Sequence, residues 1–235
     1  MNYRRIIPDI CTSMNLVFGM CSIISTFSGD LIWGSLFILF ALVADGLDGR
    51  TARFFGVASE LGKEMDSLCD LGSFGVAPAV LAWAFCLHNY GFAGMLVAIF
   101  FAICGMWRLA RFNVNASVVH GYFMGLAIPA GGNIVAMTTL LFTTLGVNPM
   151  TFGIAYPIIM AVVAYLMASH VHYPDFKGKG GDPLYLLPKI LAVVMFVGIL
   201  WLGKDALLPA LAVAVFSTYA VFGIINSLCI LVKRG

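Results

Sequence analysis

The chain has 235 residues, of which 61% are hydrophobic and only 10% are charged, and its formal net charge is +2. Soluble domains carry about 25% charged residues, so this composition excludes an ordinary soluble fold, and so small a net charge gives no indication of a nucleic-acid partner. Apolar stretches of about 17–25 residues recur along the chain, and each is long enough to cross a bilayer as an α-helix. We therefore predict an all-α, polytopic integral membrane bundle of about eight transmembrane helices, forming a single domain over residues 1–235.

The predicted helices follow the apolar stretches in chain order. Their ranges are 11–28, 31–50, 63–88, 93–111, 122–145, 152–171, 186–203 and 206–231. Short turn sequences separate several of them, at 28–30, 88–91 and 146–149. The six cysteines lie singly in apolar segments without a CxxC spacing, which indicates small buried side chains rather than a disulfide framework or a zinc site.

Basic residues are distributed unequally between the two predicted sides of the membrane. Lys204 falls on one side, and on the other fall Arg4, Arg5, Arg50, Arg53, Lys63, Arg108, Arg111, Lys177, Lys179, Lys189, Lys233 and Arg234. Cytoplasmic loops carry the excess of Lys and Arg, so the second side is predicted to be cytoplasmic. We interpret Lys177 and Lys179 as part of a basic loop that faces anionic lipid. The sequence thus predicts a multi-pass protein of the cytoplasmic membrane.

The segment 45–70 joins the second and third predicted helices on the cytoplasmic side and concentrates acidic residues. Six of the eleven acidic residues of the chain fall in it, namely Asp45, Asp48, Glu60, Glu64, Asp66 and Asp70. The aspartates form two pairs, three and four residues apart, and either spacing places both carboxylates on one face of a helix. Carboxylates crowded into apolar sequence repel one another and are costly to desolvate, so they need a cation.

The ligand types narrow the choice of cation. Carboxylate oxygens without a convergent histidine or thiolate suit Mg²⁺, Mn²⁺ or Ca²⁺. Mg²⁺ usually binds a few carboxylates together with substrate phosphates, and Arg53 offers a planar fork suited to phosphate. The segment therefore predicts a metal site that takes a phosphorylated ligand and is open to the cytosol.

This segment resembles the signature of the CDP-alcohol phosphatidyltransferase family, which here reads Asp45-x-x-Asp48-Gly49-x-x-Ala52-Arg53, eight residues, Gly62-x-x-x-Asp66-x-x-x-Asp70. The resemblance implies a membrane enzyme, homodimeric by analogy, that transfers a phosphatidyl group from a CDP-linked lipid to an alcohol and releases CMP. It implies that the four aspartates hold two divalent cations, Mg²⁺ or Mn²⁺, and that Asp70 is also the general base. The residues that would contact or make room for the CDP moiety are Gly49, Ala52, Arg53 and Gly62, with Ser59 as a further nucleotide candidate.

The acceptor alcohol is expected to be recognised outside this signature. Arg108 and Arg111 are three residues apart, so they share a helix face and could bind a carboxylate bidentately. Together with the segments 73–78, 125–130 and 173–177 they resemble the phosphatidylserine synthase branch of the family, in its integral-membrane form. That resemblance implies CDP-diacylglycerol and L-serine as substrates, and phosphatidylserine and CMP as products.

Other interpretations of the sequence stay open. The acceptor could instead be glycerol 3-phosphate, inositol or inositol phosphate, and the two arginines could merely anchor a helix end. Intramembrane aspartates also occur in cation transporters, although there we expect them at several depths and on several helices. A non-catalytic lipid-binding scaffold would release no CMP. Asn15 is polar at a costly depth in the first helix, where it either reaches the nucleotide site or bonds a neighbouring backbone.

Overall fold

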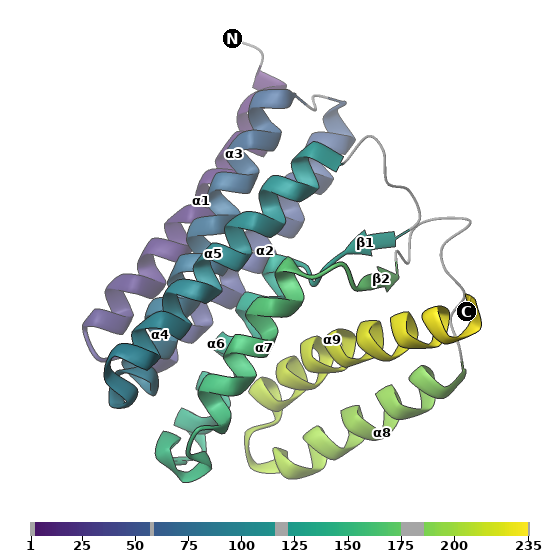
Figure 1. Cartoon of the computed structure of the whole chain (residues 1–235). Helices are drawn as coiled ribbons and strands as arrows, with labels where there is room; N and C mark the ends of the chain where they lie inside the picture. The colour runs from purple at the N-terminus through teal and green to yellow at the C-terminus, as the bar shows by residue number, and fades with distance from the viewer. Residues whose placement is uncertain (1–2, 57–58, 116–121, 175–185, 235) are drawn as a thin grey trace.

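The computed structural model describes residues 3–56, 59–115, 122–174 and 186–234. Helices dominate this part of the chain, and one short two-stranded ribbon accompanies them (Figure 1). In chain order the elements are α1 (Tyr3–Phe27), α2 (Leu31–Phe55), α3 (Glu60–Asp70), the π-helical turn η1 (Leu71–Val76), α4 (Ala77–Phe85), η2 (Leu87–Tyr90), α5 (Gly91–Asn115), β1 (Tyr122–Met124), α6 (Ile128–Thr144), η3 (Pro149–Phe152), α7 (Ala155–Ala168), β2 (His172–Pro174), α8 (Leu186–Leu202), η4 (Lys204–Ala206) and α9 (Leu207–Arg234). Lys177 and Lys179, which we assigned to a basic loop, lie outside the described residues.

The predicted membrane bundle is confirmed. Because α3, η1 and α4 follow one another without a break, each predicted range overlaps one continuous helical segment of the described chain, although some boundaries differ. Five of the described segments are long and apolar enough to cross a membrane, namely Ile7–Phe27, Leu31–Phe55, Glu60–Phe85, Leu87–Val114 and Lys204–Cys229. Shorter apolar helices cover Ile128–Thr144, Ala155–Ala168 and Pro188–Leu202. The protein is therefore a polytopic membrane protein.

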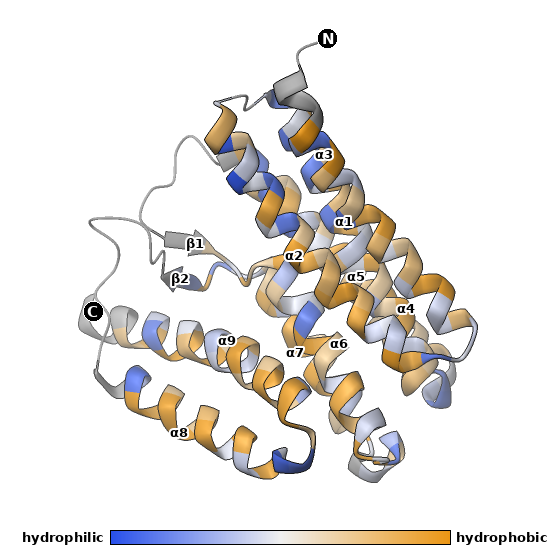
Figure 2. Cartoon of the chain, turned by 180° about the vertical axis from the view of Figure 1, so that it is seen from behind, coloured by the Kyte–Doolittle hydropathy of each residue, from blue (hydrophilic) through white to orange (hydrophobic). Residues whose placement is uncertain are grey.

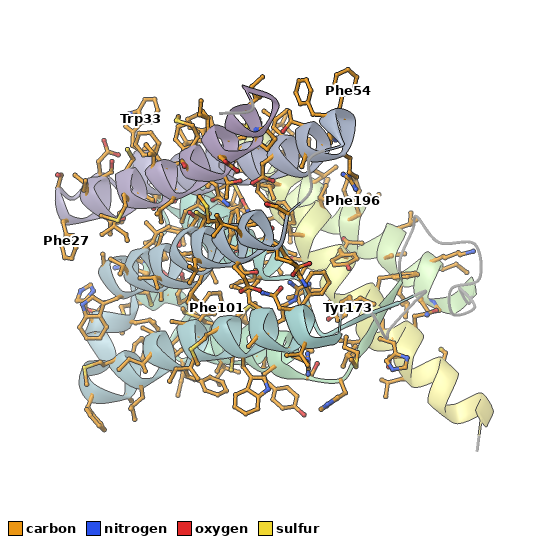
Figure 3. All side chains as sticks on the ribbon, turned by 90° about the horizontal axis from the view of Figure 1, so that it is seen from above. Phe27, Trp33, Phe54, Phe101, Tyr173 and Phe196 are labelled. Carbon is orange, nitrogen blue, oxygen red and sulfur yellow. The ribbon has the colours of Figure 1, made fainter. Side chains whose placement is uncertain are left out.

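Large apolar side chains lie both inside the bundle and on its surface. Figure 3 shows Trp33 and Phe54 pointing away from the helices, and 84% of the Phe54 surface is exposed. Phe101 and Tyr173, in contrast, lie inside the bundle and are fully buried. An apolar surface of this extent is not tolerated in water, but it matches the hydrocarbon core of a bilayer.

The second helix is longer than predicted, and this changes where its aspartates lie. We expected it to end at residue 50, but α2 continues to Phe55 and ends at Gly56, whose φ of +62° is the left-handed conformation that favours glycine. The Gly56 N–H bonds the carbonyl oxygens of Ala52 and Arg53, which caps the helix. Asp45 and Asp48 therefore lie within a regular helix, about three and two turns before its end.

The helix predicted over 122–145 is wrong at its start. The chain forms β1 at Tyr122–Met124, and α6 begins only at Ile128. Gly125 adopts a φ of +77°, which a right-handed helix cannot accommodate, and Pro129 then occupies the first turn of α6. β1 pairs antiparallel with β2, with Phe123 opposite Tyr173, so the ribbon joins two connections that the sequence alone does not relate.

Helix α1 holds the N-terminal part of the bundle together. It packs along α2 on one side and against α3, η1 and α4 on the other. Helix α6 packs against α2, α4 and α9, and α8 packs on α9. In Figure 2, hydrophilic residues gather toward the end of α1, α2 and α3 at which the N-terminus lies, and the rest of these helices is mostly hydrophobic.

Candidate functional site

Three of the four predicted aspartates meet where α2 and α3 face each other. Asp45 and Asp48 come from α2 and Asp66 from α3, and one carboxylate oxygen of each lies within 4.8 Å of the others. Asp48 is buried, and the other two are partly buried. The ends of the two helices that carry these aspartates are both defined, because α2 ends at a capping glycine, Gly56, and α3 begins at a defined residue.

That defined residue is Ser59, the N-cap of α3. Its Oγ accepts a hydrogen bond of 3.1 Å from the Gly62 backbone N–H, which satisfies one of the unpaired donors at the helix start. Ser59 was predicted as a nucleotide candidate, and here it sets where α3 begins. Because Asp66 lies seven residues further along the same helix, the cap also sets the height at which Asp66 meets Asp48.

The contacts of Asp48 and Asp66 fit a bound cation. One oxygen of each lies within 4.8 Å of the other, a separation at which two ionised carboxylates repel unless a proton or a cation lies between them. Asp66 Oδ1 is buried and has no hydrogen-bond partner among the described residues. Unsatisfied carboxylate oxygens, gathered without a thiolate or imidazole, are the ligand set of a hard divalent cation.

Asp70 lies one turn deeper on α3 and outside this group of three. It is buried, and its Oδ1 accepts a hydrogen bond of 2.9 Å from Asn15 Nδ2 of α1. The π-helical turn η1 starts at the next residue. Single π-helical turns inside helices occur frequently at functional sites, because the extra residue redirects the neighbouring side chains.

A cavity of about 530 Å³ lies beside the aspartates. Its lining consists of Pro8, Asp9, Thr12, Asp48, Gly49, Ala52, Arg53, Ser59, Leu61, Gly62, Lys63 and Asp66. The structure thus brings all five predicted nucleotide residues together around one cavity. A Cβ at Gly49 would meet only Arg53 within 4 Å, so close packing does not require a glycine there, and the residue borders open space in the cavity.

Arg108 and Arg111, which were predicted to bind the carboxylate of the acceptor together, have different surroundings. For Arg111 the predicted role needs correction. Its Nη1 donates to the Ala168 carbonyl oxygen at 2.8 Å. Its Nη2 lies 2.8 Å from the Ser169 carbonyl oxygen and 3.0 Å from that of Met124. The carbonyl groups at the end of α7 lack partners within the helix, so they attract a cation. Arg111 therefore joins α5 to the end of α7 and to β1, and these bonds to both Nη atoms give it a structural role that argues against the predicted contact with a carboxylate.

Arg108 remains a candidate. Its side chain is only 8% exposed, and its Nε is buried without a hydrogen-bond partner among the described residues. The guanidinium carbon lies 5.0 Å from the centre of the Phe112 ring, and Asp70 and Asp45 are close enough to interact with its charge. A buried guanidinium N–H without an acceptor is costly, so an anionic ligand at this position would be favourable.

Helix α1 supplies two residues that the analysis of the sequence did not assign to the site. Thr12 Oγ1 lies 2.7 Å from Asp48 Oδ2, and Asn15 bonds Asp70 as described above. The sequence shows that Asn15 is a polar residue at a costly depth in the membrane, but it does not indicate which group the Asn15 side chain bonds. The signal in the sequence is that Thr12 and Asn15 are three positions apart, which places both polar side chains on one face of an apolar helix.

Comparison with known proteins identifies the family. The model of the CDP-alcohol phosphatidyltransferase family matches residues 5–168, a range that includes all four aspartates, Thr12, Asn15 and Arg108. The chain belongs to this family. It is accordingly a membrane transferase of phospholipid biosynthesis, as its signature predicted, and α8 and α9 lie beyond the matched range.

Relatives of the chain within the family have narrower names. The CDP-diacylglycerol–serine O-phosphatidyltransferase of Helicobacter pylori is 34% identical over 99% of this chain and 95% of its own length. The protein of the same name from Bacillus subtilis is 35% identical over 78% of this chain and 97% of its own length. The archaetidylserine synthase of Methanothermobacter thermautotrophicus is 34% identical over 77% of each chain.

Proposed function

We propose that this family member transfers a phosphatidyl group from CDP-diacylglycerol to the hydroxyl group of L-serine, giving phosphatidylserine and CMP. The observation that favours an acceptor with an anionic group, such as serine, is Arg108, a buried guanidinium with an unsatisfied N–H beside Asp70. Serine brings a carboxylate, which would satisfy that guanidinium, and a hydroxyl, which must reach a base. The names of the relatives from Helicobacter pylori and Bacillus subtilis support the same acceptor.

The four aspartates are proposed to form the metal site. Asp45, Asp48, Asp66 and Asp70 would hold two divalent cations, Mg²⁺ or Mn²⁺, which when bound neutralise the charge on the diphosphate oxygens. The nucleotide would occupy the neighbouring cavity, where Gly49, Ala52 and Gly62 leave room and Arg53 can contact phosphate.

Asp70 is proposed as the general base. Asn15 binds its Oδ1, which leaves Oδ2 to accept the proton of the serine hydroxyl. The serine oxygen then bonds to the phosphorus that carries the lipid, and the bond from that phosphorus to the bridging oxygen of CMP breaks. CMP leaves with the electron pair of the broken bond, and the proton passes from Asp70 to solvent.

We infer that this site opens to the cytosol. The inference rests on the distribution of Lys and Arg, which predicts that the ends of α2 and α5 and the start of α3 lie on the cytoplasmic side. Serine and CMP would exchange with the cytosol, whereas the acyl chains would remain in lipid. The homodimer stays a prediction from the family resemblance.

The decisive experiment measures CMP release by the purified protein with CDP-diacylglycerol and Mn²⁺. The acceptors to compare are L-serine, glycerol 3-phosphate, inositol and inositol phosphate. We expect release with serine and only background with the other three. Release with a different alcohol would overturn the choice of serine and leave the family chemistry intact, and release without any alcohol would indicate hydrolysis instead of transfer.

A further inference from the structure

Helix α1 gives one hydrogen-bond donor to each of the two aspartate pairs. Thr12 Oγ1 lies 2.7 Å from Asp48 Oδ2, and Asn15 Nδ2 lies 2.9 Å from Asp70 Oδ1. Thr12 is 6% exposed and Asn15 is fully buried. Because the two residues are three positions apart, one face of α1 reaches an aspartate of α2 and another of α3 at the same time.

The position of α1 against η1 is restricted independently of these two bonds. Ser73 Oγ donates a hydrogen bond of 2.9 Å to the Asn15 carbonyl oxygen, so Asn15 is bonded through both its backbone and its side chain. One turn further along α1, a Cβ at Gly19 would lie 2.8 Å from the Ser73 Cα, which is too close for any side chain. The glycine therefore permits the close approach that lets the Asn15 amide reach Asp70.

We propose that α1 is a positioning element that serves two tasks through two side chains, with Thr12 orienting Asp48 for the cation and Asn15 orienting Asp70 for proton transfer. This inference rests on the proposed function, because it assigns Asp70 the role of base. Both side chains act through an aspartate, so we describe them as positioning residues.

The chemistry of the amide explains why Asn15 suits this task. An ionised carboxylate only accepts hydrogen bonds, so the NH₂ group of the amide must face Asp70. By occupying Oδ1, it selects Oδ2 as the proton acceptor and restricts rotation of the carboxylate. A misplacement of about 1 Å at a reacting group can cost about 10²-fold in rate.

The cost of Asn15 to the fold supports a functional reason for its presence. Polar side chains inside a membrane helix are expensive, and its amide oxygen is buried without a hydrogen-bond partner among the described residues. An apolar residue of similar size would remove this unsatisfied acceptor. Packing alone therefore favours a different residue at this position.

The test compares variants at the two positions by steady-state kinetics and by Mn²⁺ affinity, which electron paramagnetic resonance measures without turnover. Asn15→Leu should lower kcat by about 10²-fold and change the KM for CDP-diacylglycerol by less than about twofold. Because Asp70 is also a proposed metal ligand, the Mn²⁺ Kd of this variant can rise as well, but saturating Mn²⁺ should not restore its kcat. Thr12→Val, which replaces the hydroxyl by a methyl group, should raise the Mn²⁺ Kd by about 10-fold, and saturating Mn²⁺ should restore most of its kcat. Thr12→Ser keeps the hydroxyl and should bind Mn²⁺ like the unaltered protein.

Ser22→Ala is the matched control. Ser22 is a fully buried polar residue on the same helix, and its Oγ has no hydrogen-bond partner among the described residues. Its replacement should leave both kcat and the Mn²⁺ Kd unchanged. If Asn15→Leu does not fold, Asn15→Ser decides instead, because its short side chain cannot reach Asp70 and the same loss of kcat is expected.

Two results would overturn the division of tasks. One is an unchanged kcat in the Asn15 variants, and the other is an equal loss of kcat at saturating Mn²⁺ in the variants of both residues. Failure of the proposed acceptor is a separate outcome, because the same comparison can be run with whichever alcohol supports CMP release. The Mn²⁺ affinities of Thr12→Val and Ser22→Ala need no acceptor, and equal values would refute the role of Thr12 even in a protein without turnover.

Discussion

At the scale of single residues, Asp70 differs from the other three aspartates in its surroundings. It lies outside the group formed by Asp45, Asp48 and Asp66, and the amide of Asn15 donates a hydrogen bond to it. We expect Asp70→Asn to lower CMP release by at least about 10²-fold, because an amide cannot accept the hydroxyl proton. Binding of CDP-diacylglycerol, followed by calorimetry, should stay measurable. Unaltered turnover would contradict the assignment of Asp70 as the base.

The two arginines lead to opposite expectations, although only two residues separate them. Arg108→Ala should raise the KM for serine by at least about 10-fold, the loss expected when a charged hydrogen bond of at least 1.4 kcal/mol is removed. Its KM for CDP-diacylglycerol should change less. Arg111→Ala should instead lower the thermal unfolding temperature, because it leaves the carbonyl groups of Ala168, Ser169 and Met124 without their donor. Equal effects of Arg108→Ala on both substrates would argue against a contact with serine.

At the scale of elements, the start of α3 determines the height at which Asp66 faces α2. Ser59→Ala removes the hydrogen bond to Gly62 and should destabilise the protein by about 1 kcal/mol, seen as a lower unfolding temperature in detergent. Ser59→Asp keeps a capping oxygen and should retain the stability. If Ser59→Ala instead raised the KM for CDP-diacylglycerol without loss of stability, Ser59 would be a nucleotide ligand and not mainly a cap.

At the scale of the whole molecule, a cation shared between α2 and α3 should couple metal binding to stability. Removal of divalent cations with EDTA should abolish CMP release, and Mn²⁺ or Mg²⁺ should restore it. An ion that binds only the folded state raises its stability by mass action, so added Mn²⁺ should also raise the unfolding temperature. Asp48→Asn should lose most of that rise, whereas Ser22→Ala should keep it. A rise of equal size in both variants would place the ion elsewhere.

The sequence by itself determined the membrane class, the order of the helices and the spacing of the aspartates. These properties depend on hydropathy and on helical periodicity, both of which act over neighbouring residues. For the same reason the helix boundaries were least accurate where a single residue ended an element. Gly56 and Gly125, with their positive φ angles, moved the end of α2 and the start of α6 away from the predicted positions.

Only the tertiary structure decided which side chains meet. Arg108 and Arg111 share a helix and a charge, but the carbonyl groups at the end of α7 are available to Arg111 alone. Thr12 and Asn15 reach aspartates that lie 36 and 55 residues away in the chain. Contacts at such separations depend on how closely whole helices pack, as at Gly19 against Ser73, and no local pattern in the sequence specifies that distance.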